Sequence, residues 1–168
     1  MKQKNVTQIT LGILLLTTAF LLGGCTGKEP VPEETTTVFT MNIEDVKQAV
    51  LDAGVFEDEV AAIDISYSEM LMGITASDFT EGMILGGSGA TAELLAVFET
   101  ADETAAASLK EKCEAYVAKQ IQSYTDYKPA EVDKLNHAVV KSSAQYVIVC
   151  VAADYESAGT VIAQYFYQ

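Results

Sequence analysis

The sequence predicts an α+β fold, in which an antiparallel sheet built from two hairpins carries amphipathic helices packed on one face. Three observations lead to this prediction. Residues 103–124 repeat apolar side chains at helical spacing, residues 145–152 hold an uninterrupted apolar run, and glycines at 86–89 separate two short apolar segments. The expected order is helix, hairpin, helix, hairpin, helix, because helices on one face of such a sheet would bury every apolar stripe at once.

The first element is a helix over residues 43–53. Asn42 is placed to cap its N-terminus, and Gly54 lies where a left-handed residue commonly ends a helix. The segment that follows, residues 55–71, is compatible with a strand or with an irregular crossing.

Two apolar segments, 79–85 and 93–99, flank the glycine-rich connection and predict the first hairpin. Residues 92–98 alone would also fit a short helix.

The helix over residues 103–124 has the clearest pattern in the chain, because apolar and charged side chains occupy opposite faces. Its apolar stripe consists of Leu109, Cys113, Tyr116, Val117, Ile121 and Tyr124.

Pro129 ends that helix, and residues 129–136 form a short helical or looped crossing. Residues 137–141 and 145–152 then predict the second hairpin, whose apolar second strand is central in the sheet. Asp154 caps a last helix.

The N-terminus has the layout of an export signal, with Lys2 and Lys4 before the apolar run 11–22. That run is shorter than the ~20 residues that a spanning helix needs. Residues 21–25 resemble the lipobox of bacterial lipoproteins, and this resemblance implies cleavage after Gly24 and a diacylglyceryl group on Cys25. We therefore expect a cleaved signal peptide at 1–24 and attachment to the outer face of the cell membrane.

Residues 25–40 are expected to be a flexible tether, because they hold two of the three prolines, a Glu-Glu pair and a run of threonines. Residues 41–168 then form a single domain. Removal of the signal's two lysines changes the formal charge from −14 to −16, and the chain has no arginine. Nucleic-acid binding, which depends on clustered Lys and Arg, is excluded on these grounds.

Residues 43–168 resemble the domain-of-unknown-function family 4358, a family of bacterial lipoproteins. The resemblance rests on four segments, which are 92–98, the helix end at 122–124, 127–140 and 146–149. It implies that 92–98 is a strand, and it implies no activity, cofactor or catalytic residue.

The glycine-rich segment 86–89 lacks the lysine of a phosphate-binding loop, and Ser88 does not lie in a Gly-x-Ser-x-Gly motif. His137 is the only histidine, so a dyad with Cys113 or Cys150 is weaker than the interpretation of both cysteines as core residues. The same two cysteines could form a disulfide in an exported protein or remain buried free thiols, and both alternatives stay open.

Acidic residues 57–59 lack the spacing of a calcium loop, and they fit a solvated surface. We therefore expect no metal, no cofactor and no catalytic residue. The interpretation that the sequence favours is a non-catalytic lipoprotein that binds a protein or peptide of the cell envelope. The alternative is an extracytoplasmic small-solute binder or a weak hydrolase.

Overall fold

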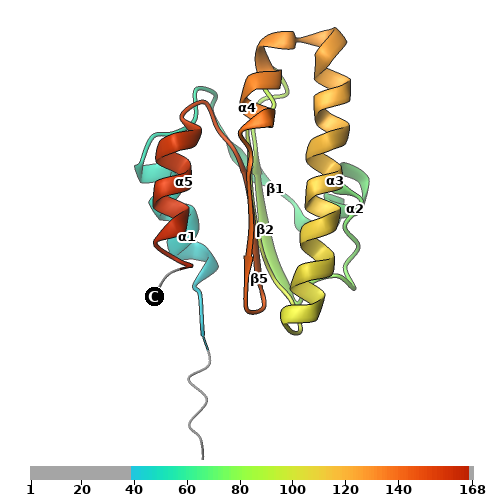
Figure 1. The fold of residues 1–168 in the computed structure, drawn as a ribbon, viewed down its shortest axis with the longest axis vertical. Coiled ribbons are helices and arrows are strands. Elements are labelled where there is room, and N and C mark those ends of the chain that lie inside the picture. Colours follow the sequence, from blue (N-terminus) through green and yellow to red (C-terminus); the bar gives the residue numbers. More distant parts are fainter. Residues whose placement is uncertain (1–38, 167–168) are drawn as a thin grey trace, which may run out of the picture. The chain divides into compact units, whose positions relative to one another are not determined.

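The fold combines one sheet with helices on both of its faces, as the computed structural model of residues 39–166 shows (Figure 1). Its elements in order are α1 (Ile43–Asp52), β1 (Ala61–Ile63), the 3₁₀ helix η1 (Ile65–Tyr67), α2 (Ser68–Met72), β2 (Glu81–Gly86), β3 (Leu94–Glu99), α3 (Glu103–Tyr127), the 3₁₀ helix η2 (Pro129–Glu131), α4 (Val132–Asn136), β4 (Val139–Ser143), β5 (Tyr146–Val151) and α5 (Tyr155–Ala163). The predicted signal peptide at 1–24, Cys25 and the tether up to residue 38 lie outside the described residues. None of the described helices is both long and apolar enough to cross a membrane.

The five strands form one antiparallel sheet in the order β1-β2-β3-β5-β4. At its centre β3 pairs with β5, so that Leu95 lies opposite Cys150 and Ala96 opposite Val149. The α+β class with an antiparallel sheet is therefore confirmed.

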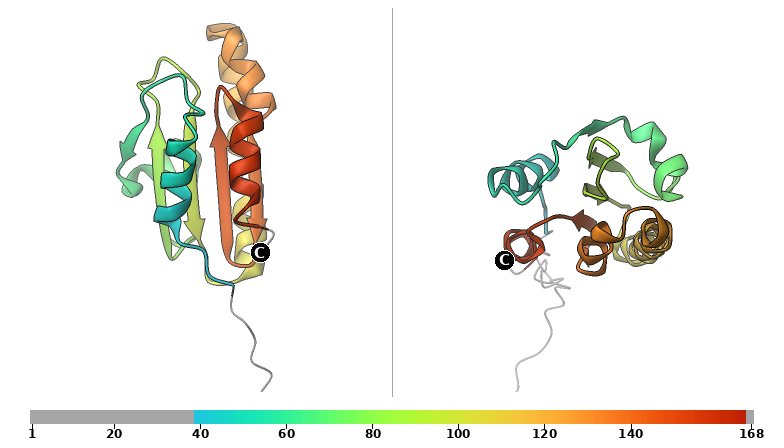
Figure 2. Two further views of the ribbon diagram at one scale, coloured as in Figure 1. Left: turned by 90° about the vertical axis from the view of Figure 1, so that its left-hand side faces the viewer. Right: turned by 90° about the horizontal axis from the view of Figure 1, so that it is seen from above.

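The prediction that the helices pack on one face of the sheet is wrong. In Figures 1 and 2, α1 and α5 cover one face, and α2, α3 and α4 cover the other. Successive side chains of β5 point to opposite faces, with Ile148 packing among residues of α1 and α5 and Val149 among residues of α3. A strand buried on both faces is apolar at every position, which is the pattern of residues 146–151.

The predicted order omits five short elements, which are β1, η1, α2, η2 and α4. The segment 55–71 contains a three-residue strand, β1, at the edge of the sheet, followed by η1 and α2. The sheet is therefore larger than two hairpins. Strands as short as β1 carry too few residues to produce a recognisable alternation.

Helix ends follow local side-chain chemistry that is visible in the sequence. The Asn42 side chain accepts a hydrogen bond from the Glu44 amide at 2.9 Å, and Gly54, which follows α1, has a φ of +62°. Asp154 accepts from the amide of Ser157 at 2.9 Å at the start of α5. These predicted caps are confirmed.

Candidate functional site

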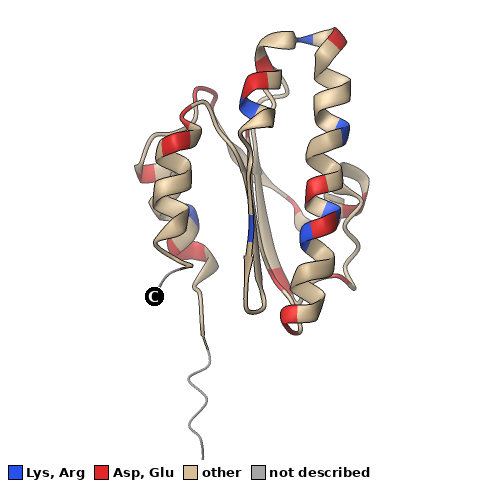
Figure 3. Ribbon diagram, in the orientation of Figure 1, with Lys and Arg blue, Asp and Glu red and all other residues tan. Residues whose placement is uncertain are grey.

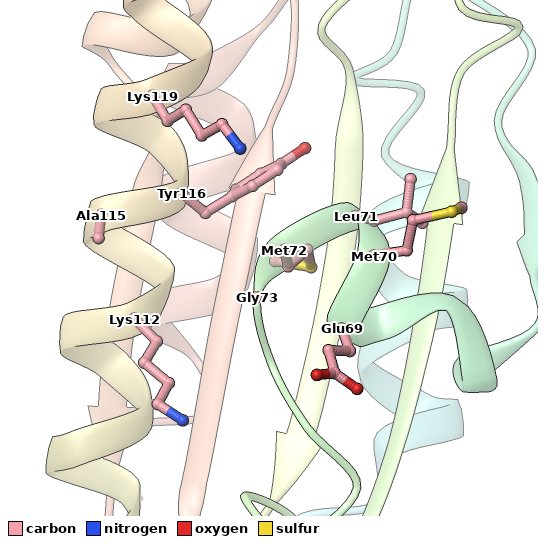
Figure 4. A pocket seen from close by; sticks show the side chains of 9 residues that line it. All are labelled: Glu69, Met70, Leu71, Met72, Gly73, Lys112, Ala115, Tyr116 and Lys119. Carbon is pink, nitrogen blue, oxygen red and sulfur yellow. The ribbon is translucent and has the colours of Figure 1, made fainter.

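A groove of about 330 Å³ runs between α2 and α3, on the face of the sheet that these helices cover (Figure 4). We call it the α2–α3 groove. Its lining residues are Glu69, Met70, Leu71, Met72, Gly73, Lys112, Ala115, Tyr116 and Lys119.

The wall from α2 is formed by a helix of only five residues. It ends at Gly73, which has a φ of +71° and donates from its amide to the Glu69 carbonyl at 2.9 Å. The side chains of a single helical turn point in all directions around its axis, so Met72 is buried in the core while Met70 points outward.

The wall from α3 is formed by residues that recur at positions i, i+4 and i+7. Lys112, Tyr116 and Lys119 therefore lie on one side of this helix, and Figure 4 shows their side chains extending toward α2. The apolar residues Cys113 and Val117 lie on the neighbouring stripe and are buried against the sheet.

Exposed apolar side chains come from the segment that forms the α2 wall and from the turn before it. Tyr67, Met70 and Leu71 have 52%, 74% and 36% of their surface exposed, and they come from η1 and α2. We call these three residues the apolar patch. The fourth large exposed apolar side chain among the described residues, Tyr127, lies at the C-terminal end of α3.

The groove carries charges of both signs. The ammonium group of Lys112 lies 2.6 Å from the carboxylate of Asp78. Burial favours the neutral acid, but Lys112 and the hydrogen bonds from Thr75 outweigh this effect and lower the pKa of Asp78. Burial raises the pKa of Tyr116 to about 12, so its hydroxyl stays neutral at physiological pH.

A second polar cluster lies near the loop between β2 and β3, and we call it the carboxylate–lysine network. The Lys134 ammonium group lies 3.0 Å from Glu57, 3.1 Å from Glu93 and 3.4 Å from Glu131. Glu93 also accepts hydrogen bonds from the amides of Glu57 and Asp58, and Glu131 accepts one from Ala92.

The network joins three separate segments of the chain. Its buried side chains are satisfied, since no buried side-chain polar atom in residues 39–166 lacks a hydrogen-bond partner. Burial opposes the charge of Lys134, but bonds to Glu57 and Glu93 outweigh it, so that its pKa is raised. A pocket of about 350 Å³ borders the network, but each of its three carboxylates already has Lys134 as an ion-pair partner. We therefore assign the network a structural role.

The two cysteines lie on opposite faces of the sheet. Cys113 packs in the core beneath α3, and Cys150 packs among residues of α1 and α5. Both are free and buried, and burial raises the pKa of each thiol to about 12. The sequence left open whether these cysteines form a disulfide or remain free thiols, and in the structure both are free thiols.

His137 lies at the surface, whereas both thiols are buried. Its side chain is 47% exposed, and its ring stacks on Tyr155 with ring centroids 4.0 Å apart. Both possible cysteine partners are buried in the cores.

The acidic segment 57–59 has a role that the sequence did not reveal. The carboxylate of Asp58 accepts hydrogen bonds from the amide and hydroxyl of Ser88 and from the hydroxyl of Thr91, each at 2.9 Å. These bonds lower the pKa of Asp58 and fix the glycine-rich connection to the neighbouring loop. Ser88 is therefore a structural partner of Asp58.

The remaining candidate residues lie at the two ends of the chain. Cys25 lies outside the described residues. At the C-terminus, Tyr165 and Phe166 pack against the core of α1 and α5. In the described part of the chain, no three or more His, Cys, Asp or Glu side chains are grouped so as to hold a metal ion.

Comparison with known proteins identifies a family. The model of the family described as Domain of unknown function (DUF4358) matches residues 57–152. This range runs from the segment before β1 to the end of β5, so it includes the whole α2–α3 groove and excludes α1 and α5. A search of the curated proteins and a search of the solved structures found no match.

Proposed function

The chain belongs to the family described as Domain of unknown function (DUF4358), and from this premise we propose that it is a non-catalytic module of the cell envelope that binds a protein or peptide through the α2–α3 groove. In the proposal, a lipid on Cys25 holds the domain at the outer face of the cell membrane. The resemblance of residues 21–25 to a lipobox supports this attachment.

The apolar patch beside the groove is the observation that carries the proposal. Single exposed apolar residues are common on proteins and need no explanation. Here the three side chains come from five consecutive residues, and two of them, Met70 and Leu71, line a concave surface. Methionine adapts its shape to different partners, and it is frequent on surfaces that bind peptides.

Site-specific photocrosslinking on intact cells tests this function. A photoreactive amino acid replaces Met70 in the groove or, as the control, Ser157 on α5 at the opposite face. We expect a recurrent crosslinked protein from position 70 that is missing from position 157. Identical products from both positions, or none from position 70, would contradict the proposal.

The groove also supports the alternative of a small-solute binder, because its volume of about 330 Å³ falls at the lower end of the range for small-molecule sites. Saturable protection of position 70 from crosslinking by a small solute, with no protein product, would favour this alternative.

A further inference from the structure

The end of the α2–α3 groove near Lys119 carries an ammonium group that the domain does not neutralise. Lys119 is exposed, and its side chain has no ion pair with any residue in the range 39–166. Figure 4 shows it extending over Tyr116 toward α2. In a chain with a formal charge of −14, a lysine facing a groove without an acidic partner leaves a position that a carboxylate of a partner can fill.

The other end of the groove has the opposite charge. Lys112 is already paired with Asp78 at 2.6 Å. Glu69 is exposed on the facing wall, and its carboxylate has no ion pair or hydrogen bond with any described residue. The sum of these three groups is one negative charge. This end therefore favours a cation and disfavours a second carboxylate.

The surface between these ends is apolar. Met70 and Leu71 line it from α2, and Tyr116 and Ala115 line it from α3. Figure 4 shows the Tyr116 ring extending from α3 toward α2, with the side chains of Met70 and Leu71 at the outer rim of the groove. An apolar side chain that enters this part of the groove would remove both its own surface and that of Met70 from water.

The spacing of the two ends fits an extended peptide. Lys112 and Lys119 are seven residues apart on α3, which corresponds to roughly 10 Å along the helix axis. An extended chain advances by about 3.3 Å per residue, so about three residues cover this length. From this spacing and these charges we infer that the groove binds an extended segment in which an apolar side chain lies between one acidic and one basic residue, about three positions apart. The inference rests on the proposed function and specifies its partner.

The charge pattern argues against other occupants. A strongly acidic peptide would meet Glu69 and the overall negative charge of the domain, whose other acidic residues are spread over its helices and loops (Figure 3). A strongly basic peptide would be repelled by the ammonium group of Lys119. Only a segment with one charge of each sign satisfies both ends.

Binding of synthetic peptides to the purified full-length protein in non-ionic detergent tests the inference. Blocked, fluorescently labelled peptides carry a central leucine between an acid and a base, between two acids or between two bases, and affinity is measured by fluorescence anisotropy. Because a peptide can bind in either direction, both orders of the mixed pair are included. We expect the mixed pair to bind about five- to tenfold more tightly than either like-charged pair.

Charge reversal at the two ends makes the test specific. Lys119→Glu should transfer the preference to the peptide with two bases, and Glu69→Lys should transfer it to the peptide with two acids. The double variant should restore the preference for the mixed pair. Lys110→Glu on α3 and Glu156→Lys on α5 change the net charge equally but lie outside the groove, so they should leave the preference unchanged.

Each failure has its own meaning. Equal binding of all peptides, with binding lost in Met70→Ser, would overturn the charge inference and leave the proposed function intact. No binding of any peptide, together with no crosslinked protein at position 70, would overturn both. Self-association of the protein that is lost in Met70→Ser would identify a second copy as the occupant and would overturn the inference. Binding of the protein to anionic vesicles through the groove would overturn it as well.

Discussion

The carboxylate of Glu93, immediately before β3, lies 3.1 Å from the ammonium group of Lys134 in α4, with 0% of the Glu93 side chain and 11% of the Lys134 side chain exposed. The same carboxylate accepts hydrogen bonds from the backbone amides of Glu57 and Asp58. One buried acid thus holds a loop, a strand and a helix that are far apart in the sequence. We infer from these contacts that Glu93 stabilises the domain.

We expect Glu93→Ala to lower the free energy of unfolding by about 2–4 kcal/mol, because it leaves the amides of Glu57 and Asp58 without their acceptor and removes one of the three carboxylates around Lys134. Glu93→Gln keeps an acceptor and should cost less. Urea denaturation measures both changes. The control is Glu114→Ala, which removes an exposed helical ion pair with Lys110 and should cost at most about 1 kcal/mol. Equal losses in Glu93→Ala and Glu114→Ala would contradict the role of Glu93.

The two thiols should react slowly in the folded protein. Burial raises the pKa of Cys113 and Cys150 to about 12, and the thiolate is the reactive form. At pH 8 we expect iodoacetamide to modify each at least about 100-fold more slowly than in urea. Peptide mass spectrometry distinguishes the two sites from Cys25. Rapid modification of either thiol without denaturant would contradict its place in the core.

Stability should fall at alkaline pH. Folding raises the pKa of each thiol from 9.0 to about 12, so its contribution is fully present below pH 9 and is lost as the pH rises toward 12. Between these values we expect a loss of about 1.4 kcal/mol per pH unit for each thiol. Urea denaturation between pH 8 and pH 10 measures the slope. Cys113→Ala and Cys150→Ala should each make it shallower, whereas an unchanged slope would contradict the assignment.

The turn between β4 and β5 offers a stabilising substitution. Ala144 has a φ of +47°, a conformation that disfavours a residue with a β-carbon. We expect Ala144→Gly to raise the free energy of unfolding by about 1 kcal/mol. Ala53→Gly is the matched control, because Ala53 has a φ of −71° and gains nothing from glycine. A loss of stability in Ala144→Gly would show that the turn does not strain the chain.

Replacement of Cys25 tests the membrane attachment. We expect Cys25→Ala to abolish both metabolic labelling with a fatty acid and retention in the membrane fraction, because the thiol is the predicted site of the lipid. Immunoblotting of membrane and soluble fractions measures the distribution. Continued lipid labelling of the variant would rule out Cys25 as the attachment site.

The sequence predicted the regular elements well where local chemistry determines them. The helix expected at 103–124 is Glu103–Tyr127, and the strand expected at 145–152 is Tyr146–Val151. Each has a repeating apolar pattern and a capping or breaking residue at an end. The family resemblance also correctly implied a strand rather than a helix at 92–98, although β3 begins two residues later and is Leu94–Glu99.

The two-sided packing of the helices was missed although the sequence contained its signal. The apolar run 146–151 placed this strand in the centre of the sheet, and the same run requires cover on both faces. Period-two patterns show which faces are buried, but they do not show which helix covers each of them.

Neither polar cluster was predicted, because each brings together residues far apart in sequence. Glu93 and Lys134 are separated by 41 positions, and Asp58 and Ser88 by 30. The one local signal was Glu93 itself, a charged residue adjoining the apolar strand at 94–98. The α2–α3 groove had no such signal, because α2 is a single turn between segments of irregular structure.

The division of β5 between two cores has a consequence for how chains with this fold can vary in length. Ile148 belongs to the core beneath α1 and α5, and Val149 belongs to the core beneath α3. Deletion of one residue within the strand would turn every later side chain to the other face of the sheet. Side chains that fit one core would then enter the other. Insertions and deletions are therefore restricted to the connections between strands, while the strands themselves must keep their number of residues.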